Sequence, residues 1–129
     1  MKVKTLVAVA GFSGAVAVIL GALGAHALSN LLPEASLASF KTGVLYHLLH
    51  ALLLIGIAGL SNFLSEKELK TSFYLLVIGK LFFSGSIYLL ATKPIHGLEV
   101  GFLGPVTPIG GLLLISAWIY VATSALRKT

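Results

Sequence analysis

The stretch LVAVAGFSGAVAVILGALGAHAL, residues 6–28, contains no charged side chain. A helix needs roughly 20 predominantly apolar residues to cross the hydrocarbon core of a bilayer. Three further apolar stretches approach or exceed this length, at residues 43–60, 72–91 and 108–126. We therefore predict an all-α integral membrane protein, a bundle of four transmembrane helices that forms a single domain over residues 1–129.

The composition favours the same class of protein and excludes several others. Hydrophobic residues make up 57% of the chain and charged residues only 10%, which is far too apolar for an ordinary soluble domain. The absence of cysteine excludes disulfide bonds, thiolate nucleophiles and iron–sulfur clusters. The sequence has no recognisable nucleophile–base pair, phosphate-binding loop or paired intramembrane carboxylates, so we expect no enzymatic activity and no cofactor.

The segments between the apolar stretches are polar or rich in residues that end helices. Residues 29–42 contain Pro33 and Glu34, residues 62–71 contain four charged side chains, and residues 92–107 contain three glycines and two prolines. We expect all three segments to be connecting loops.

The positive charges predict the orientation of the bundle. Six basic residues fall on the side that carries both termini and the middle loop: Lys2, Lys4, Lys67, Lys70, Arg127 and Lys128. Lys41 and Lys93 alone fall on the other side. Because basic flanks stay cytoplasmic, we predict a multi-pass protein of the cell (inner or plasma) membrane with both termini in the cytoplasm.

The partners expected from these patterns are the lipid bilayer and another copy of the chain. The net charge of +5 lies in short flanks without interleaved aromatics, so nucleic acid is not expected. Small residues recur about every four positions along the first helix, at Ala10, Gly14, Ala17, Gly21 and Ala25. Such a stripe lets helix backbones approach closely, either within one chain or in a homo-oligomer.

Three histidines interrupt the apolar stretches and mark the candidate functional site. His26 lies at the outer end of the first predicted helix, and His47 and His50 lie three residues apart in the outer half of the second. An ionisable side chain at membrane depth is costly and normally faces the bundle interior or a watery cavity.

Three roles are open to these histidines. The favoured one is a neutral imidazole that forms a hydrogen bond with a neighbouring helix. The second is a site that exchanges protons or holds a polar solute. The third is a metal or haem site, which needs convergent ligands and so requires His26, His47 and His50 to face one another.

The third predicted helix carries a polar stripe, because Lys80, Ser84 and Tyr88 are spaced four residues apart. An ammonium group at mid-membrane costs roughly 2.5 to 3.5 kcal/mol on insertion scales. We expect Lys80 to lower this cost by extending toward the cytoplasmic side. If it faces inward instead, the stripe would meet the histidines and form a polar seam.

The fourth predicted helix has a clear start signal, with Thr107 as its N-cap and Pro108 at its first position. Gly110 and Gly111 leave the amides of the first turn sterically open to an anion, although simple capping is the expected role. Trp118 is assigned to packing and to the aromatic belt.

Four motifs, in this order, carry a family resemblance: GALGAH at 21–26, FKTGVLYHLLHAL at 40–52, FSGSIYLLA at 83–91 and VTPIGG at 106–111. The chain resembles the small four-span membrane proteins grouped as domain of unknown function 423, which include transmembrane protein 256. The resemblance implies an integral membrane protein without an established biochemical role.

The resemblance also implies which polar positions are shared. The family's histidine positions correspond to His26 and His50. Where His47 stands, family members have glutamine, and where Lys80 stands they tend to have a small or uncharged residue. The candidate site implied by the family is therefore the pair His26 and His50, near the hydroxyl groups of Ser84, Ser86, Tyr88 and Thr107.

Taken together, the sequence favours a non-enzymatic protein with a structural or interaction role. The alternative is a small transporter or channel that handles protons or a polar solute through His26, His50 and Lys80. A metal- or haem-binding membrane protein is the third hypothesis.

Overall fold

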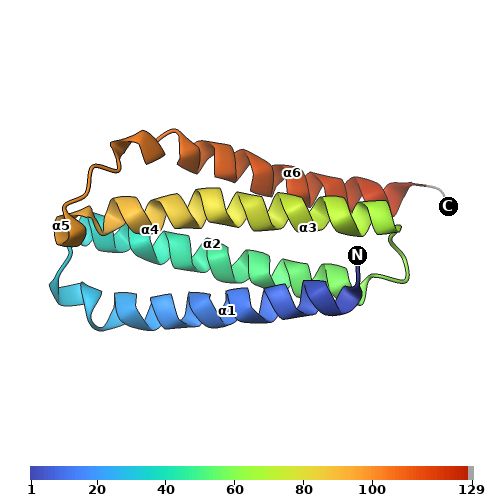
Figure 1. Cartoon of the computed structure of the whole chain (residues 1–129), viewed down its shortest axis with the longest axis horizontal. Coiled ribbons are helices and arrows are strands. Elements are labelled where there is room, and N and C mark those ends of the chain that lie inside the picture. The colour runs from blue at the N-terminus through green and yellow to red at the C-terminus, as the bar shows by residue number, and fades with distance from the viewer. Residues whose placement is uncertain (128–129) are drawn as a thin grey trace.

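The computed structural model describes residues 1–127 and consists of helices connected by short segments (Figure 1). The elements are α1 (Val3–Ala25), η1 (Leu28–Asn30), α2 (Glu34–Gly59), α3 (Glu66–Lys80), η2 (Leu81–Gly85), α4 (Ser86–Ala91), α5 (Lys93–His96), η3 (Gly101–Leu103) and α6 (Val106–Leu126). Four helical segments are long and apolar enough to cross a membrane, and the third of them is built from α3, η2 and α4 without interruption. The predicted all-α, four-span fold is confirmed.

Two helices begin six or more residues earlier than the sequence predicts. The α2 helix begins at Glu34 rather than at residue 43, and α3 begins at Glu66 rather than at residue 72. Both additional stretches are polar, so hydropathy does not detect them. Pro33 directly precedes α2, and a glutamate in the first turn complements the positive end of the helix dipole. The prediction of loops over these residues is wrong.

The start of α3 is fixed by a capping box. Ser65 Oγ accepts a hydrogen bond from the Glu68 backbone N–H at 3.2 Å, and the Ser65 N–H donates to Glu68 Oε2 at 2.9 Å. These two bonds satisfy amide groups that the helix itself leaves without partners. At the same end of the bundle, the terminal amino group of Met1 pairs with Glu66 at 2.7 Å, and Arg127 pairs with Glu68 at 3.4 Å. We call this end, with both chain ends and the α2–α3 connection, the termini end, and the opposite end the loop end.

The four spans lie side by side in the order α1, α2, α3–α4, α6 (Figure 1). The α1 helix packs mainly on α2, and α6 packs mainly on α3 and η2. Ala10 and Ala17 from the small-residue stripe are buried, whereas Ala25 is exposed. A Cβ atom on Gly21 would lie 3.3 Å from the side chain of Val44 on α2. Three members of the stripe, Ala10, Ala17 and Gly21, are therefore used for close packing within the chain.

A very close backbone contact joins α6 to η2, which is a π-helix. A Cβ atom on Gly110 would lie only 2.3 Å from the backbone nitrogen of Phe83, so no side chain fits there. The backbone of η2 therefore covers Gly110. This is one of the two glycines that, from the sequence, leave the first-turn amides sterically open to an anion. Beside this contact the Ser86 hydroxyl donates to the carbonyl of Phe82 and contacts the hydroxyl of Thr107. The predicted N-cap is wrong, because α6 begins at Val106 and Thr107 lies within its first turn.

We expect Gly110→Ala to lower the free energy of unfolding by about 1–3 kcal/mol, because overpacking against backbone cannot be relieved by moving a side chain. Gly111→Ala is the matched control: its Cβ would lie 3.6 Å from the Phe83 ring, an ordinary contact. The control should leave stability unchanged or raise it by up to about 1 kcal/mol. Unfolding of each purified variant in mixed micelles measures the difference. Equal stability of the two variants would contradict the close α6–η2 contact.

Candidate functional site

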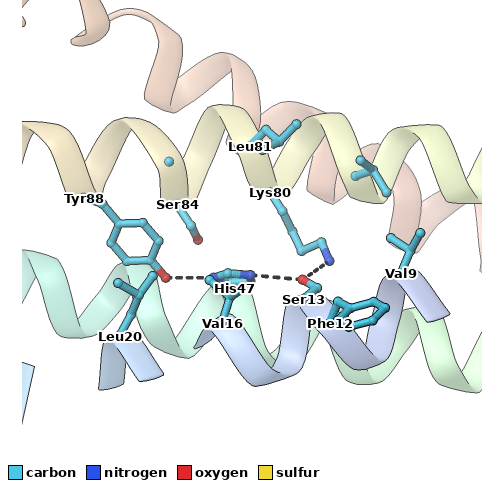
Figure 2. Close-up of a pocket in the computed structure, with 12 residues that line it drawn as sticks. Val9, Phe12, Ser13, Val16, Leu20, His47, Lys80, Leu81, Ser84 and Tyr88 are labelled. Atoms are coloured by element: carbon cyan, nitrogen blue, oxygen red, sulfur yellow. Dashed lines mark hydrogen bonds between the residues drawn. The ribbon is translucent and has the colours of Figure 1, made fainter. Parts of the chain in front are cut away.

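Lys80 lies inside the bundle rather than extending toward the membrane surface. Its side chain is 6% exposed, and Nζ donates a hydrogen bond to Ser13 Oγ on α1 at 2.7 Å (Figure 2). The expectation that Lys80 extends to the cytoplasmic side is therefore wrong. The physical reason is its helix face: Ser72, Leu76 and Ser84, spaced four residues apart with Lys80, are all buried. This spacing in the sequence is a signal for the inward position.

Lys80 begins a chain of hydrogen bonds that connects three of the four spans (Figure 2). Ser13 Oγ lies 3.0 Å from His47 Nε2 on α2, and His47 Nδ1 lies 2.9 Å from the Tyr88 hydroxyl on α4. Next to this chain, the Ser84 hydroxyl donates to the carbonyl of Gly43 at 2.7 Å. The polar seam expected for an inward-facing lysine is present, and Ser13 is the member that the sequence did not indicate.

We assign the donors in this chain to one direction. An ammonium group can only donate, so the Ser13 oxygen accepts from Lys80. We place the Ser13 proton toward His47 Nε2, which then carries no proton, and the His47 Nδ1–H donates to the oxygen of Tyr88. This assignment makes His47 a neutral imidazole with the proton on Nδ1.

His50 makes a separate connection, which is directed toward α6. Its Nδ1–H donates to the Tyr46 carbonyl at 2.6 Å, and its Nε2 accepts from the indole N–H of Trp118 on α6 at 3.1 Å. The side chain is 4% exposed. Both ring nitrogens are therefore occupied, and Trp118, which the sequence assigns only to packing and the aromatic belt, supplies a specific donor.

His26 does not join either group. The α1 helix ends at Ala25, and His26 occupies its C-cap with an exposed side chain. Its carbonyl oxygen accepts a hydrogen bond from the Ser29 hydroxyl at 2.6 Å. The structure thus does not bring His26 and His50 together, and within residues 1–127 no three histidine, cysteine or acidic side chains converge as metal ligands.

A groove of about 500 Å³ runs along the hydrogen bonds that begin at Lys80, between α1 and the α3–α4 span (Figure 2). We call it the lateral groove; it is lined by Val9, Phe12, Ser13, Val16, Leu20, His47, Val77, Lys80, Leu81, Ser84, Gly85 and Tyr88. Phe12 and Leu81 on its rim are 77% and 64% exposed and lie within spans. The groove therefore opens toward lipid, with apolar walls and a polar floor.

The hydrogen-bond geometry predicts the tautomers of three histidines. His47 and His50 should carry the neutral-state proton on Nδ1. His96 should carry it on Nε2, because Nε2 lies 2.8 Å from the Leu89 carbonyl and Nδ1 accepts from the Leu98 N–H at 3.0 Å. Nitrogen-15 NMR of histidine-labelled protein distinguishes the two forms, with His96 as the internal reference. A proton on Nε2 of His47 would contradict the assigned donor direction.

Comparison with known proteins gives matches over nearly the whole chain. The family model described as "Protein of unknown function (DUF423)" matches residues 20–111. The chain is 35% identical over 125 residues to UPF0382 membrane protein YwdK of Bacillus subtilis, covering 96% of this chain and 98% of that one. It is 36% identical over 127 residues to a UPF0382 membrane protein of Haemophilus influenzae, covering 98% and 95%.

A third relative carries a more specific description. The chain is 30% identical over 131 residues to UPF0382 inner membrane protein YgdD of Escherichia coli (strain K12), covering 98% of this chain and 93% of that one. No solved structure matches the chain.

Proposed function

This chain belongs to the DUF423 family of membrane proteins, as its motifs predict, and we propose that it has a non-enzymatic, structural role based on polar contacts between its helices. The observation that carries the proposal is His50. Its two ring nitrogens are both engaged, one with the Tyr46 carbonyl on α2 and the other with Trp118 on α6. A buried imidazole in this state joins helices and has no free nitrogen for a ligand or a substrate proton.

The two polar connections together reach every span. The hydrogen bonds from Lys80 through Ser13 and His47 to Tyr88 connect α1, α2 and the α3–α4 span. The His50–Trp118 bond connects α2 to α6. Interhelical hydrogen bonds in membranes contribute about 0.6 kcal/mol on average and at most about 1.7. Such contributions matter in a bundle surrounded by lipid, because burying apolar side chains against other helices gives little advantage over lipid contact.

The alternative role, transport of protons or a polar solute, is supported by the one-directional hydrogen-bond chain. However, the series of hydrogen bonds begins at Lys80, near the middle of the third span, and continues only toward the loop end. Between Lys80 and the termini end lies an apolar core cluster that includes the fully buried side chains Leu6, Leu54, Ile57 and Leu76. A polar path through one copy is blocked by this cluster, so the geometry favours the structural role.

A double-mutant cycle tests the structural role at the His50–Trp118 contact. We expect His50→Phe and Trp118→Phe to be coupled by about 0.6–1.7 kcal/mol in unfolding free energy, since each removes one partner of the same bond. His26→Asn is the control, because His26 is exposed, and should stay within about 0.5 kcal/mol of the parent.

Two outcomes would contradict the structural role. One is a coupling energy of zero in the cycle. The other is a proton flux into liposomes that contain the protein, abolished by His47→Phe. A conducting path would then pass through the hydrogen bonds that His47 makes.

We also propose that the protein resides in the cell membrane, which is the inner membrane or the plasma membrane. The termini end then faces the cytoplasm. Five basic residues lie at this end, namely Lys2, Lys4, Lys67, Lys70 and Arg127, and Lys128 lies outside the described residues. Lys41 and Lys93 lie at the loop end. This asymmetry has the sign expected for cytoplasmic termini, and the Escherichia coli relative is described as an inner membrane protein.

Reporter fusions at the C-terminus test the orientation in a bacterial host. Green fluorescent protein, which folds in the cytoplasm, should be fluorescent there, and alkaline phosphatase, which needs the periplasm, should be inactive. The same two reporters inserted after Gly97, in the connection at the loop end, should give the reverse pattern. Active phosphatase at the C-terminus would overturn the orientation.

A further inference from the structure

We propose that the lateral groove binds a long-chain carboxylic acid from the bilayer, with the carboxyl group against Lys80. This inference goes beyond the structural role and rests on a separate set of observations. Three of them carry it: the charge of Lys80, the chemistry of the groove walls, and the position and length of the groove.

Within residues 1–127, Lys80 has no acidic partner. The four glutamates lie near the ends of the helices: Glu34 begins α2, Glu66 and Glu68 lie in the first turn of α3, and Glu99 follows α5. Among residues 1–127, Ser13 is the hydrogen-bond partner of the ammonium group, which has three N–H donors. A carboxyl group supplies the missing acceptors, and its complex with the lysine has no net charge wherever the proton resides.

The walls of the groove select for a hydrocarbon chain. Beyond the polar floor, the lining consists of aliphatic and aromatic side chains, among them Val9, Val16 and Leu20 of α1 and Val77 of α3. Ser13, His47 and Ser84 already make hydrogen bonds within the protein. The ammonium of Lys80 is therefore the charged group in the groove that a polar head would meet.

The groove has room for the part of a hydrocarbon tail that lies next to the carboxyl group. From Ser13, which bonds Lys80, to Leu20 it extends along α1, about 10 Å at 1.5 Å per residue. The rest of a long tail would continue past Leu20 into the lipid. The groove volume of about 500 Å³ lies within the range of about 300–1,000 Å³ for small-molecule sites.

The depth of Lys80 excludes phospholipid headgroups as the bound group. Lys80 lies near the middle of the span Glu66–Ala91, far from the interface where phosphate groups remain. A fatty acid in its protonated form carries no charge and can reach this depth. The exposed rim at Phe12 and Leu81 gives it lateral access from the lipid.

Photo-crosslinking of a diazirine analogue of palmitic acid to the protein in phosphatidylcholine nanodiscs tests the proposal. We expect saturable labelling of groove residues, at least tenfold weaker in Lys80→Met. Lys70→Met is the matched control, because Lys70 is exposed near the start of α3. Its labelling should equal that of the parent. Unlabelled palmitic acid should compete, whereas its methyl ester should not.

A second variant separates loss of the groove from loss of the charge. Val16→Trp places a large ring on the groove wall, at a position exposed to lipid, and leaves Lys80 in place. It should also lose labelling. An ammonium group at mid-membrane costs more than one interhelical hydrogen bond returns, so Lys80→Met, which removes both the charge and its bond to Ser13, should unfold no more easily than the parent. Unchanged labelling in Lys80→Met or in Val16→Trp, or equal competition by the methyl ester, would overturn the proposal.

Discussion

Helices in a bilayer gain little from burying apolar side chains against one another, because the surrounding lipid is equally apolar. Packing must therefore come from close backbone approach and from polar groups that find partners only inside the bundle. This chain uses both means. Gly110 lets α6 touch the backbone of η2, and Ser13 and Trp118 supply partners for a buried lysine and a buried histidine.

The α2 helix is the centre of the polar organisation because it has neighbours on two sides. His47 and His50 are three residues apart, so at 3.6 residues per turn their side chains diverge by about 60°. That angle is sufficient to send His47 toward α1 and α4 and His50 toward α6. A single shared site for both rings is therefore incompatible with the position of α2 between its neighbours. The two connections share no hydrogen bond: the one through His47 joins α1, α2 and the α3–α4 span, and the one through His50 joins α2 to α6.

Hydropathy was sufficient to predict the four spans, and the four-residue spacing of Lys80, Ser84 and Tyr88 correctly predicted one shared face. The polar first turns of α2 and α3 escaped prediction, because their stability comes from capping and the helix dipole rather than from apolar length. The partners of buried groups escaped prediction for another reason. A lysine at mid-membrane predicts a cost, but only the packing of α1 shows that Ser13 helps to offset it.

Because η2 is a π-helix, the number of residues in this segment determines where the side chains that follow it point. In a regular α-helix each step of four residues rotates the side chain by about 40°, so Ser72 and Tyr88 would point about 160° apart. The wider turn of η2 winds less per residue and reduces this divergence. Ser72 is buried, and Tyr88 reaches His47 on the same inward side. The segment thus acts as a one-residue insertion. Deleting one residue between 81 and 85 would keep the span but turn Tyr88 toward a different neighbour.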